Sequence, residues 1–371
     1  MRDRLVYAEI DLKAFSNNFK NVKKSIRPTC KIMAVVKGNA YGHGLVRIAQ
    51  KAEEIGVDYL GVACLYEARI IREAGVLLPI LLLGYTDSAS VEEIISLGIS
   101  PTVIDSDVAK RLNELAIKHK KVISIHVKID TGMHRFGLLP SEAIYFIKSL
   151  SKYKNLFLEG VFTHFAESDA LDPSFTQKQL RVFQGFLNEL SVLFLTPPLI
   201  HAANSAAILR FRESHFSMVR AGKMLYGPLP MAGISVPFTS QPIISVKTKI
   251  VQVKDLKKGD SVGYGRAFVA SCDMRIATLP VGYADGFRRA PNTFHEVLVK
   301  GKRCKIVGMV SMDQSTIDIS NVPDAKVGDE VVLIGKQNEI SITVEDVAAN
   351  LGTISYEVVT SFSERVGREY L

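Results

Sequence analysis

A lysine that directly follows a short apolar run is the first residue whose position suggests chemistry. Lys37 ends the stretch Met-Ala-Val-Val-Lys and precedes the Gly- and Asn-rich stretch Gly-Asn-Ala-Tyr-Gly-His-Gly. Burial at the end of a strand would disfavour the charged ammonium and free the amine as a nucleophile. Such an amine can form a Schiff base with an aldehyde. The alternative is a lysine at a strand edge whose ammonium reaches water, and position alone leaves both open.

Other polar residues follow apolar runs in the same way. Arg135, in Asp-Thr-Gly-Met-His-Arg-Phe-Gly, offers a planar fork that suits a carboxylate or a phenolate. Lys128, if it points inward, needs a partner or a neutralising modification. Asn204 and Ser205 either cap the next helix or mark a helix N-terminus that binds an anion. The stretch Arg-Ala-Gly-Lys from Arg220 combines backbone donors with cations, which suits a phosphate.

The elements that must position these residues alternate between short apolar runs and amphipathic helices. The expected strands are residues 31–36, 59–62, 80–83, 102–104, 122–129, 156–162, 199–202 and 217–219. The expected helices are 45–55, 106–118, 174–195 and 205–211. Buried parallel strands that alternate with helices predict a closed (β/α)8 TIM barrel of the α/β class, and a doubly wound open sheet is the alternative. In such a barrel the candidate residues share the mouth at the C-terminal strand ends.

The pattern changes after residue 240. Short β-branched runs separated by Gly, Asp and Pro turns cover 246–253, 275–279, 297–299, 305–310, 316–319 and 330–334. They predict a mostly antiparallel β domain, with one helix at Val344–Leu351 between Thr343 and Gly352. We therefore expect a cofactor-binding barrel domain at 1–240 and a β-rich domain at 241–371. A strand at 5–10 could pair with the second domain.

Composition narrows the choice of partners and compartment. The chain has 371 residues and a net charge of +8, but its cations are mixed with acids, so nucleic-acid binding is not expected. Four widely spaced cysteines give no metal motif and predict free thiols in a reducing compartment. No signal-like N-terminus is seen, and the longest apolar run, 76–83, is too short to span a bilayer. These features predict a cytoplasmic protein with a small-molecule substrate and no metal.

A reactive amine, backbone donors and several cations at one barrel mouth fit a phosphorylated aldehyde, pyridoxal 5′-phosphate, joined through Lys37. Several sequence motifs, taken in their order along the chain, point to a known protein family. The stretches are VVKGNAYGHG, DTGMHRFG, HFAESD, NSA, VRAGKMLYG, VGYGRAF, VGYADGF and GMVSMDQ. Over nearly its whole length, the chain resembles the alanine racemases, fold-type III pyridoxal-phosphate enzymes. It departs from them at Gly38, usually Ala, and at Lys223, usually apolar, which could contact phosphate or, as we slightly favour, point into solvent.

The resemblance implies roles for individual residues. Lys37 holds the cofactor and acts as base on the D-face, and Tyr264 of the other subunit acts on the L-face. Cofactor contacts correspond to Tyr41, His164, Asn204, Ser205, Arg220, Gly222, Lys223 and Tyr356, with Arg220 at the pyridine nitrogen and His164 linking Arg220 to Tyr264. Arg135, Met312 and Asp313 correspond to substrate contacts, and Lys128 to a lysine that is carbamylated in some members. Independently of the resemblance, Tyr283 and Asp285 are expected either to line an entrance or to have a structural role in a loop.

Racemisation removes the α-proton on one face and returns a proton on the other, so it needs two opposed acid/base groups. We therefore expect a cytoplasmic homodimer with shared active sites that interconverts L- and D-alanine and supplies D-alanine for peptidoglycan. The alternatives are a broad-specificity or serine racemase, a decarboxylase of the same fold, or a noncatalytic pyridoxal-phosphate carrier. The presence of a second domain with Tyr264 argues against the carrier, and the GYGRAF and NSA motifs argue against the decarboxylase.

Overall fold

A computed structural model of the chain describes residues 4–229, 231, 233–235, 237–290 and 293–371. Two compact units share these residues. The first comprises residues 14–40 and 45–242, and the second comprises the residues up to Lys13, residues 41–44 and residues 243–371. The first unit ends at Pro242, and the N-terminal segment belongs to the second unit, because residues 7–10 pair with strands of that unit.

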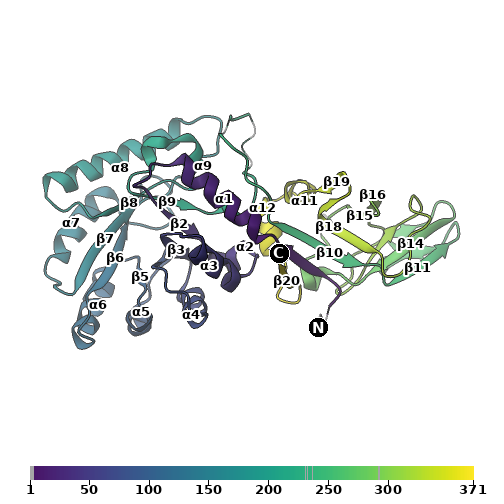
Figure 1. Ribbon diagram of the computed structural model, residues 1–371, viewed down its shortest axis with the longest axis horizontal. Coiled ribbons are helices and arrows are strands. Elements are labelled where there is room, and N and C mark those ends of the chain that lie inside the picture. Colours follow the sequence, from purple (N-terminus) through teal and green to yellow (C-terminus); the bar gives the residue numbers. More distant parts are fainter. Residues whose placement is uncertain (1–3, 230, 232, 236, 291–292) are drawn as a thin grey trace. The chain divides into compact units, whose positions relative to one another are not determined.

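The first unit is built on eight parallel strands in its described part (Figure 1). They are β2 (Lys31–Val35), β3 (Tyr59–Val62), β4 (Ile80–Leu82), β5 (Ser100–Pro101), β6 (Ile123–Lys128), β7 (Leu156–Phe162), β8 (Leu199–His201) and β9 (Met218–Ala221). One sheet has the order β5-β4-β3-β2-β9 and another has the order β6-β7-β8. A parallel bridge from Thr102 to His126 joins β5 to β6, and backbone bonds such as Arg220 N to Ala203 O join β9 to β8. The strands therefore close into the predicted barrel.

Helices follow the strands of this unit and supply its outer layer (Figure 1). They are α1 (Leu12–Ser25), α3 (Leu45–Glu54), α4 (Leu65–Glu73), α5 (Val91–Leu97), α6 (Ser106–Lys118), α7 (Pro140–Leu150), α8 (Ser174–Val192), α9 (Ser205–Arg210) and α10 (Lys223–Tyr226). The four predicted helices are confirmed with ends within three residues. Local signals set some of these ends: the Asp105 side chain accepts from two backbone N–H groups at the start of α6.

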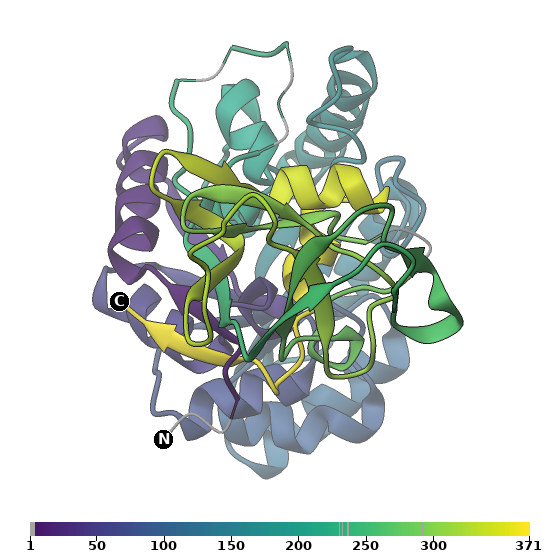
Figure 2. The same cartoon turned by 90° about the vertical axis from the view of Figure 1, so that its right-hand side faces the viewer.

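The second unit is mostly antiparallel β structure, as predicted (Figure 2). Its main sheet has the order β16-β15-β18-β10-β1-β20, and only the β1–β20 pair within it is parallel. The strands of this sheet are β1 (Tyr7–Ile10), β10 (Ile244–Lys249), β15 (Glu296–Val299), β16 (Lys302–Lys305), β18 (Glu330–Gln337) and β20 (Gly367–Tyr370), with β19 (Ile340–Ile342) paired to β18. Smaller sheets hold β11 (Gln252–Leu256), β14 (Met274–Leu279) and β17 (Ser315–Asp318), and β12 (Ser261–Val262) and β13 (Phe268–Val269).

Some predicted strands of this unit were wrong in extent. The run 246–253 is two strands, β10 and β11, which belong to different sheets because the chain turns at Ile250 and Val251. The run 305–310 is displaced: β16 ends at Lys305, and Gly308 has a φ of 71°, which extended backbone does not adopt. The helix α11 (Val344–Leu351) is confirmed, with the Thr343 side chain as its N-cap and Gly352 in the left-handed conformation after it.

The remaining helical pieces of the second unit are α12 (Ser355–Thr360) and two short 3-10 turns, Tyr264–Arg266 and Tyr283–Asp285. The helices in the described residues are all too short or too polar to cross a bilayer.

Candidate active site

The segment after β2 holds Lys37 in an unusual backbone setting. Gly38, Asn39 and Ala40 all have left-handed dihedrals, with φ values of 65°, 54° and 53°. Such a turn is disfavoured for L-residues by about 1–2 kcal/mol each, so the surrounding structure must hold it in place. The buried Glu67 accepts from Gly38 N at 2.5 Å, and the side chain of Asn39 accepts from Leu45 N at 2.7 Å. Glycine at 38 therefore suits this turn, and the turn fixes Lys37 at the strand end.

The Lys37 amine loses its proton more readily than the amine of a solvated lysine does. Although the residue as a whole is exposed, partial burial of the amine lowers its pKa, and the nearby Arg135 and Arg220 lower it further. Glu67 opposes this shift but does not reverse it. The environment is the one that was expected for a nucleophilic amine.

Lys128 is the last residue of β6, Arg135 lies in the loop that follows, and both add to the same positive region. The Lys128 side chain is buried, and its Nζ lies 5.1 Å from the ring centroid of Phe136 and 5.8 Å from that of Phe162. Burial lowers its pKa to about 8, with Arg135 and Arg220 contributing in the same direction. The inward orientation predicted for Lys128 is confirmed. The positive charges of this region repel one another, and they belong to Lys37, Lys128, Arg135 and Arg220.

Arg220 lies at the end of β9, is 4% exposed, and is held by five hydrogen bonds within the first unit. Its Nη1 donates to Nδ1 of His201 at 3.1 Å and to the His201 carbonyl at 3.0 Å. Its Nη2 donates to Nδ1 of His164 at 3.1 Å and to the carbonyls of Thr163 and Ala202 at 2.7 and 2.9 Å. The guanidinium orientation is therefore fixed by the barrel itself.

Both histidines beside Arg220 are neutral. Burial, followed by the charge of Arg220, holds the pKa of His164 and of His201 well below the usual range. Since a guanidinium only donates, Nδ1 of each ring must carry a lone pair and Nε2 must carry the hydrogen. The expected link between Arg220 and His164 is present. Its continuation to Tyr264, a residue of the second unit, stays a prediction.

Backbone donors converge near the predicted phosphate contacts of the barrel. Asn204 is the N-cap of α9: its side chain accepts from Ala207 N at 3.0 Å and from the Ser168 hydroxyl at 2.7 Å. The neighbouring Ser205 hydroxyl accepts from Gly222 N at 2.9 Å and from Met224 N at 3.4 Å. Two backbone N–H groups thus already bond one hydroxyl oxygen, which leaves the hydrogen of that hydroxyl to donate, an arrangement that is compatible with an anion.

Lys223 corrects one expectation about this region. Its side chain is only 5% exposed, so it does not point into solvent as we favoured. The ammonium Nζ would lie 3.8 Å from a Cβ placed on Gly227. A turn of α10 brings the two positions together.

Two predicted phosphate contacts belong to the second unit. Tyr41 and Tyr356 pack against each other there, with ring centroids 5.8 Å apart. Burial, with a smaller contribution from Tyr356, raises the pKa of Tyr41, so its hydroxyl remains a hydrogen-bond donor at neutral pH. Gly42 beside it has no room for a side chain, because a Cβ would lie 2.1 Å from the Val359 carbonyl oxygen.

Tyr264 and the substrate-contact candidates lie on exposed loops of the second unit. Tyr264 is 67% exposed and Met312 is 53% exposed. The Arg289 guanidinium lies 5.7 Å from the Tyr264 ring centroid. The 283–284 segment contacts the loop of Met312, since Tyr283 N donates to the Ser311 carbonyl at 3.1 Å and Ala284 N donates to the Met312 carbonyl at 3.0 Å.

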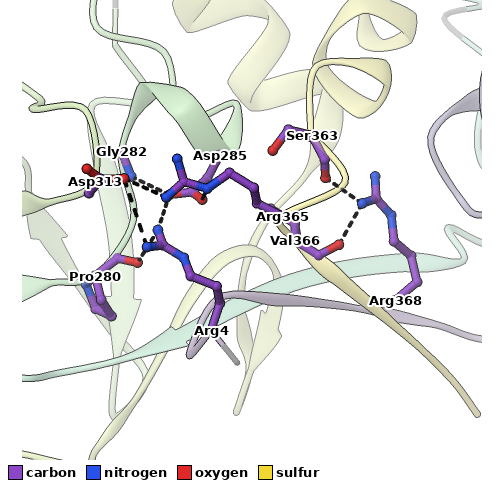
Figure 3. Close-up of polar contacts among 9 residues, drawn as sticks. All are labelled: Arg4, Pro280, Gly282, Asp285, Asp313, Ser363, Arg365, Val366 and Arg368. Atoms are coloured by element: carbon purple, nitrogen blue, oxygen red, sulfur yellow. Dashed lines mark hydrogen bonds and ion pairs between the residues drawn. The ribbon is translucent and has the colours of Figure 1, made fainter. Parts of the chain in front are cut away.

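The loop that carries Asp313 is tied down by charges that the sequence did not single out (Figure 3). Arg4 donates to Asp285 at 2.6 Å and lies 3.9 Å from Asp313, and Arg365 contacts both acids. Asp285 also accepts from Gly282 N at 3.0 Å and has no exposed side-chain area. It therefore anchors loops, which is the loop role that the sequence left open beside an entrance role. The four segments that supply Arg4, Asp285, Asp313 and Arg365 are far apart in sequence, so no local pattern could reveal the cluster.

The arrangement in the barrel fits the predicted cofactor. A phosphate would meet the Ser205 hydroxyl, whose hydrogen is left to donate, and the mutually repelling cations of the Lys37 region favour the binding of an anion. An amine with a lowered pKa suits the aldehyde.

Comparisons with known proteins agree over the whole chain. Residues 10–230 match the family described as alanine racemase, N-terminal domain, and residues 243–370 match alanine racemase, C-terminal domain. An alanine racemase of Halothermothrix orenii is 42% identical over 367 residues, covering 99% of this chain and 97% of the relative. A solved alanine racemase of Clostridium difficile 630 has a TM-score of 0.94 and 38% identity, covering 99% of this chain and 96% of that one.

A third comparison is a crystal structure of the Bacillus anthracis alanine racemase with bound L-Ala-P. It has a TM-score of 0.93 and 38% identity and covers 99% of this chain and 95% of that one. Sequence and fold agree over nearly the whole chain, and the chain belongs to the alanine racemase family.

Proposed function

We propose that this chain interconverts L-alanine and D-alanine with pyridoxal 5′-phosphate bound through Lys37, and that it supplies D-alanine for peptidoglycan. When bound, the cofactor supplies an electron sink that makes the α-hydrogen of the amino acid acidic. The observation that carries the proposal is the grouping of Lys37, Arg135 and the Arg220–His164 pair in the barrel unit of an alanine racemase family member. The chain is an amino-acid racemase.

Lys37 is the base on the D-face. The lowered pKa of its amine makes it a better proton acceptor at neutral pH than a solvated lysine would be. The left-handed turn after Lys37 limits where this amine can reach, which favours proton transfer on one side of the substrate.

Tyr264 of the partner subunit is the acid/base group on the L-face, so the enzyme is a homodimer with shared active sites. Two observations support this role. Tyr264 lies on an exposed turn, and the Nε2–H of His164 is available as a donor because Arg220 occupies Nδ1. Met312 and Asp313 come from the partner with Tyr264. Arg135 of the barrel contacts the substrate carboxylate.

The other residues hold the cofactor. Tyr41, Asn204, Ser205, Gly222, Lys223 and Tyr356 surround its phosphate, with Asn204 acting by capping α9. Arg220 donates to the pyridine nitrogen and keeps it from taking up a proton. Carbamylation of Lys128 would turn a buried cation into an anion beside Arg135. We also propose a cytoplasmic location, since the four cysteines are unpaired.

Subunit complementation tests the shared site. Lys37→Ala and Tyr264→Phe are each purified as inactive homodimers, then unfolded together and refolded with cofactor. In a mixed dimer one site has both intact residues, so random pairing should restore about a quarter of the wild-type activity. If both residues of a site came from one chain, mixing would restore nothing.

Parallel assays with alanine and serine decide the substrate, and equal turnover of serine would favour a broad-specificity racemase.

A further inference from the structure

A line of hydrogen-bonded side chains runs through the barrel interior from Arg220 to an acid that has no assigned role. His201 Nε2 lies 3.1 Å from Nδ1 of His126, and His126 Nε2 lies 3.3 Å from Oε2 of Glu159. At the far end, Glu159 accepts from the Tyr59 hydroxyl at 2.7 Å and the Ser100 hydroxyl at 3.3 Å. His126 and His201 have no exposed area. The line therefore joins the predicted cofactor site to the interior of the barrel.

The hydrogen bonds of this line have only one consistent direction. Arg220 cannot accept, so His201 accepts on Nδ1 and carries its hydrogen on Nε2. That hydrogen must be donated to Nδ1 of His126, which leaves the hydrogen of His126 on Nε2, pointing at Glu159. A carboxylate accepts only, so Glu159 ends the series that Arg220 begins.

Glu159 is ionised and is the acid of this line. Burial raises its pKa, but hydrogen bonds from His126 and Tyr59 outweigh this and lower the pKa below the usual value. Among the described ion pairs, Arg220 contacts no carboxylate directly, although it is buried. The charge of Arg220 is thus balanced through two polarised imidazoles.

A register shift between β6 and β7 places Glu159 beside this line of side chains. The register between β6 and β7 shifts so that Ile125 pairs with Leu158 and His126 pairs with Gly160, which leaves Glu159 as the extra residue of a bulge. Bulges re-aim side chains and are common near active sites. A Cβ at Gly160 would lie 2.4 Å from the His126 ring, so a side chain there would displace His126.

We propose that Glu159 is a positioning residue that acts through His126 and His201 to hold Arg220 in the orientation its role at the cofactor ring nitrogen requires. The proposal rests on the proposed role of Arg220. Without the acceptor at Glu159, the His126 hydrogen has no fixed place and either tautomer becomes available. His201 could then present a hydrogen to Arg220 in place of a lone pair, and the guanidinium would lose one of its anchors.

The first experiment uses the apoenzyme and so does not depend on catalysis. Nitrogen-15 NMR of labelled histidines reports which ring nitrogen carries the hydrogen, with His126 and His201 assigned from the signals lost in His126→Gln and His201→Gln. Wild type should show both rings as the Nε2–H form. Glu159→Gln keeps an acceptor and should retain this form, whereas Glu159→Leu should give mixed tautomers at both rings.

The second experiment uses the holoenzyme. Glu159→Leu should lower kcat for alanine about tenfold or more, the range seen when outer partners of functional histidines are removed, with a smaller change in KM. The visible absorbance of the bound cofactor should change in its pH dependence. Glu93→Gln, which removes a carboxylate paired with Arg69 on the helical layer, is the matched control and should behave as wild type.

The outcomes separate the role of Glu159 from that of Arg220. Unchanged tautomers, kcat and absorbance in Glu159→Leu, with only a lower melting temperature, would overturn the positioning role. If Glu159→Leu does not fold, Glu159→Ala carries the test with the same measurements. Mixed tautomers and a lower kcat would support the proposal, and wild-type tautomers and kcat would overturn it. If Arg220→Ala leaves the cofactor absorbance unchanged, the role of Arg220 fails instead.

Discussion

Arg220 donates to Nδ1 of His164 across 3.1 Å, and this contact decides the state of both residues. The ring must be neutral to accept, and its hydrogen is confined to Nε2. The guanidinium keeps its charge near neutral pH even though burial lowers its pKa to about 9. A permanent donor therefore faces the position at which we place the cofactor ring, and a neutral imidazole stands beside it.

This relationship predicts the effect of replacing Arg220 by a carboxylate. Arg220→Glu should allow the ring nitrogen to hold a proton, and a stronger electron sink should prolong the carbanion. We expect more pyruvate per alanine racemised, by about tenfold or more, and slower racemisation. Coupled assay of pyruvate against D-alanine measures the ratio. Arg111→Glu, at an exposed position of α6, serves as control, and an unchanged ratio in Arg220→Glu would refute the explanation.

Lys37 is predicted to hold the cofactor covalently. Lys37→Ala should lose the visible absorbance band of the lysine-bound cofactor, and borohydride followed by mass spectrometry should find no label on the peptide that contains residue 37. The exposed Lys31, at the start of the strand that precedes Lys37, gives the control Lys31→Ala, which should keep both signals. Labelling of another lysine in the wild-type enzyme would contradict the assignment.

Tyr264→Phe should separate the two faces of the reaction. Racemisation should fall about 10²- to 10⁴-fold in both directions, the usual contribution of a general acid–base group, because the equilibrium constant is fixed. In D2O, however, D-alanine should still exchange its α-hydrogen through Lys37, while exchange from L-alanine should fall with racemisation. NMR of the α-hydrogen measures both rates. Tyr145→Phe, at another exposed tyrosine, should change neither, and equal loss of both exchanges would argue against two bases.

The Asp285 cluster should matter for the stability of the second unit. Asp285→Asn keeps the side-chain shape but leaves Arg4 and Arg365 facing a neutral group. Loss of a partner in a fully buried pair costs about 3–5 kcal/mol, and since both arginines are partly exposed we expect about 2 kcal/mol in urea unfolding. Asp324→Asn, in an exposed pair with Lys300, should have a much smaller effect. A similar loss in both variants would show that burial of Asp285 is not the cause.

Strand ends could be predicted from the sequence because apolar runs and glycine turns are local signals. Lys37, Arg135, His164 and Arg220 follow such runs, and the barrel places them together by its topology alone. The short strand β5 was harder to predict from the sequence. It comprises Ser100 and Pro101, and Thr102 adds only a bridge to His126.

Contacts between distant segments could not be predicted in this way. The line from Arg220 to Glu159 depends on a one-residue register shift, and nothing in the alternation of β7 marks it. The left-handed dihedrals of Asn39 and Ala40 likewise go against the preference of these residues and are imposed by contacts such as Glu67 with Gly38.

Lys128 gives a prediction that depends on pH. Its folded-state pKa of about 8 lies below the ordinary value of 10.5, so burying the charged form costs stability below pH 8. This cost should disappear as the pH rises from about 8 toward 10.5, because the unfolded state alone then binds the proton. Lys128→Met should therefore be the more stable apoenzyme at pH 7, and its advantage should shrink by pH 10. Since Lys128 is not completely shielded, the shift will be moderate.

The same neutral amine should react with carbon dioxide, forming an N–C bond and releasing one proton to give a carbamate. With 13C-bicarbonate, NMR should show a carbamate signal that grows from pH 7 to pH 8 and is absent in Lys128→Met. Lys178→Met is the matched control, because Lys178 also lies over an aromatic ring, 6.0 Å from Phe175, but is exposed. A signal that survives in Lys128→Met, or a stability difference that does not vary with pH, would show that burial has not altered the chemistry of this amine.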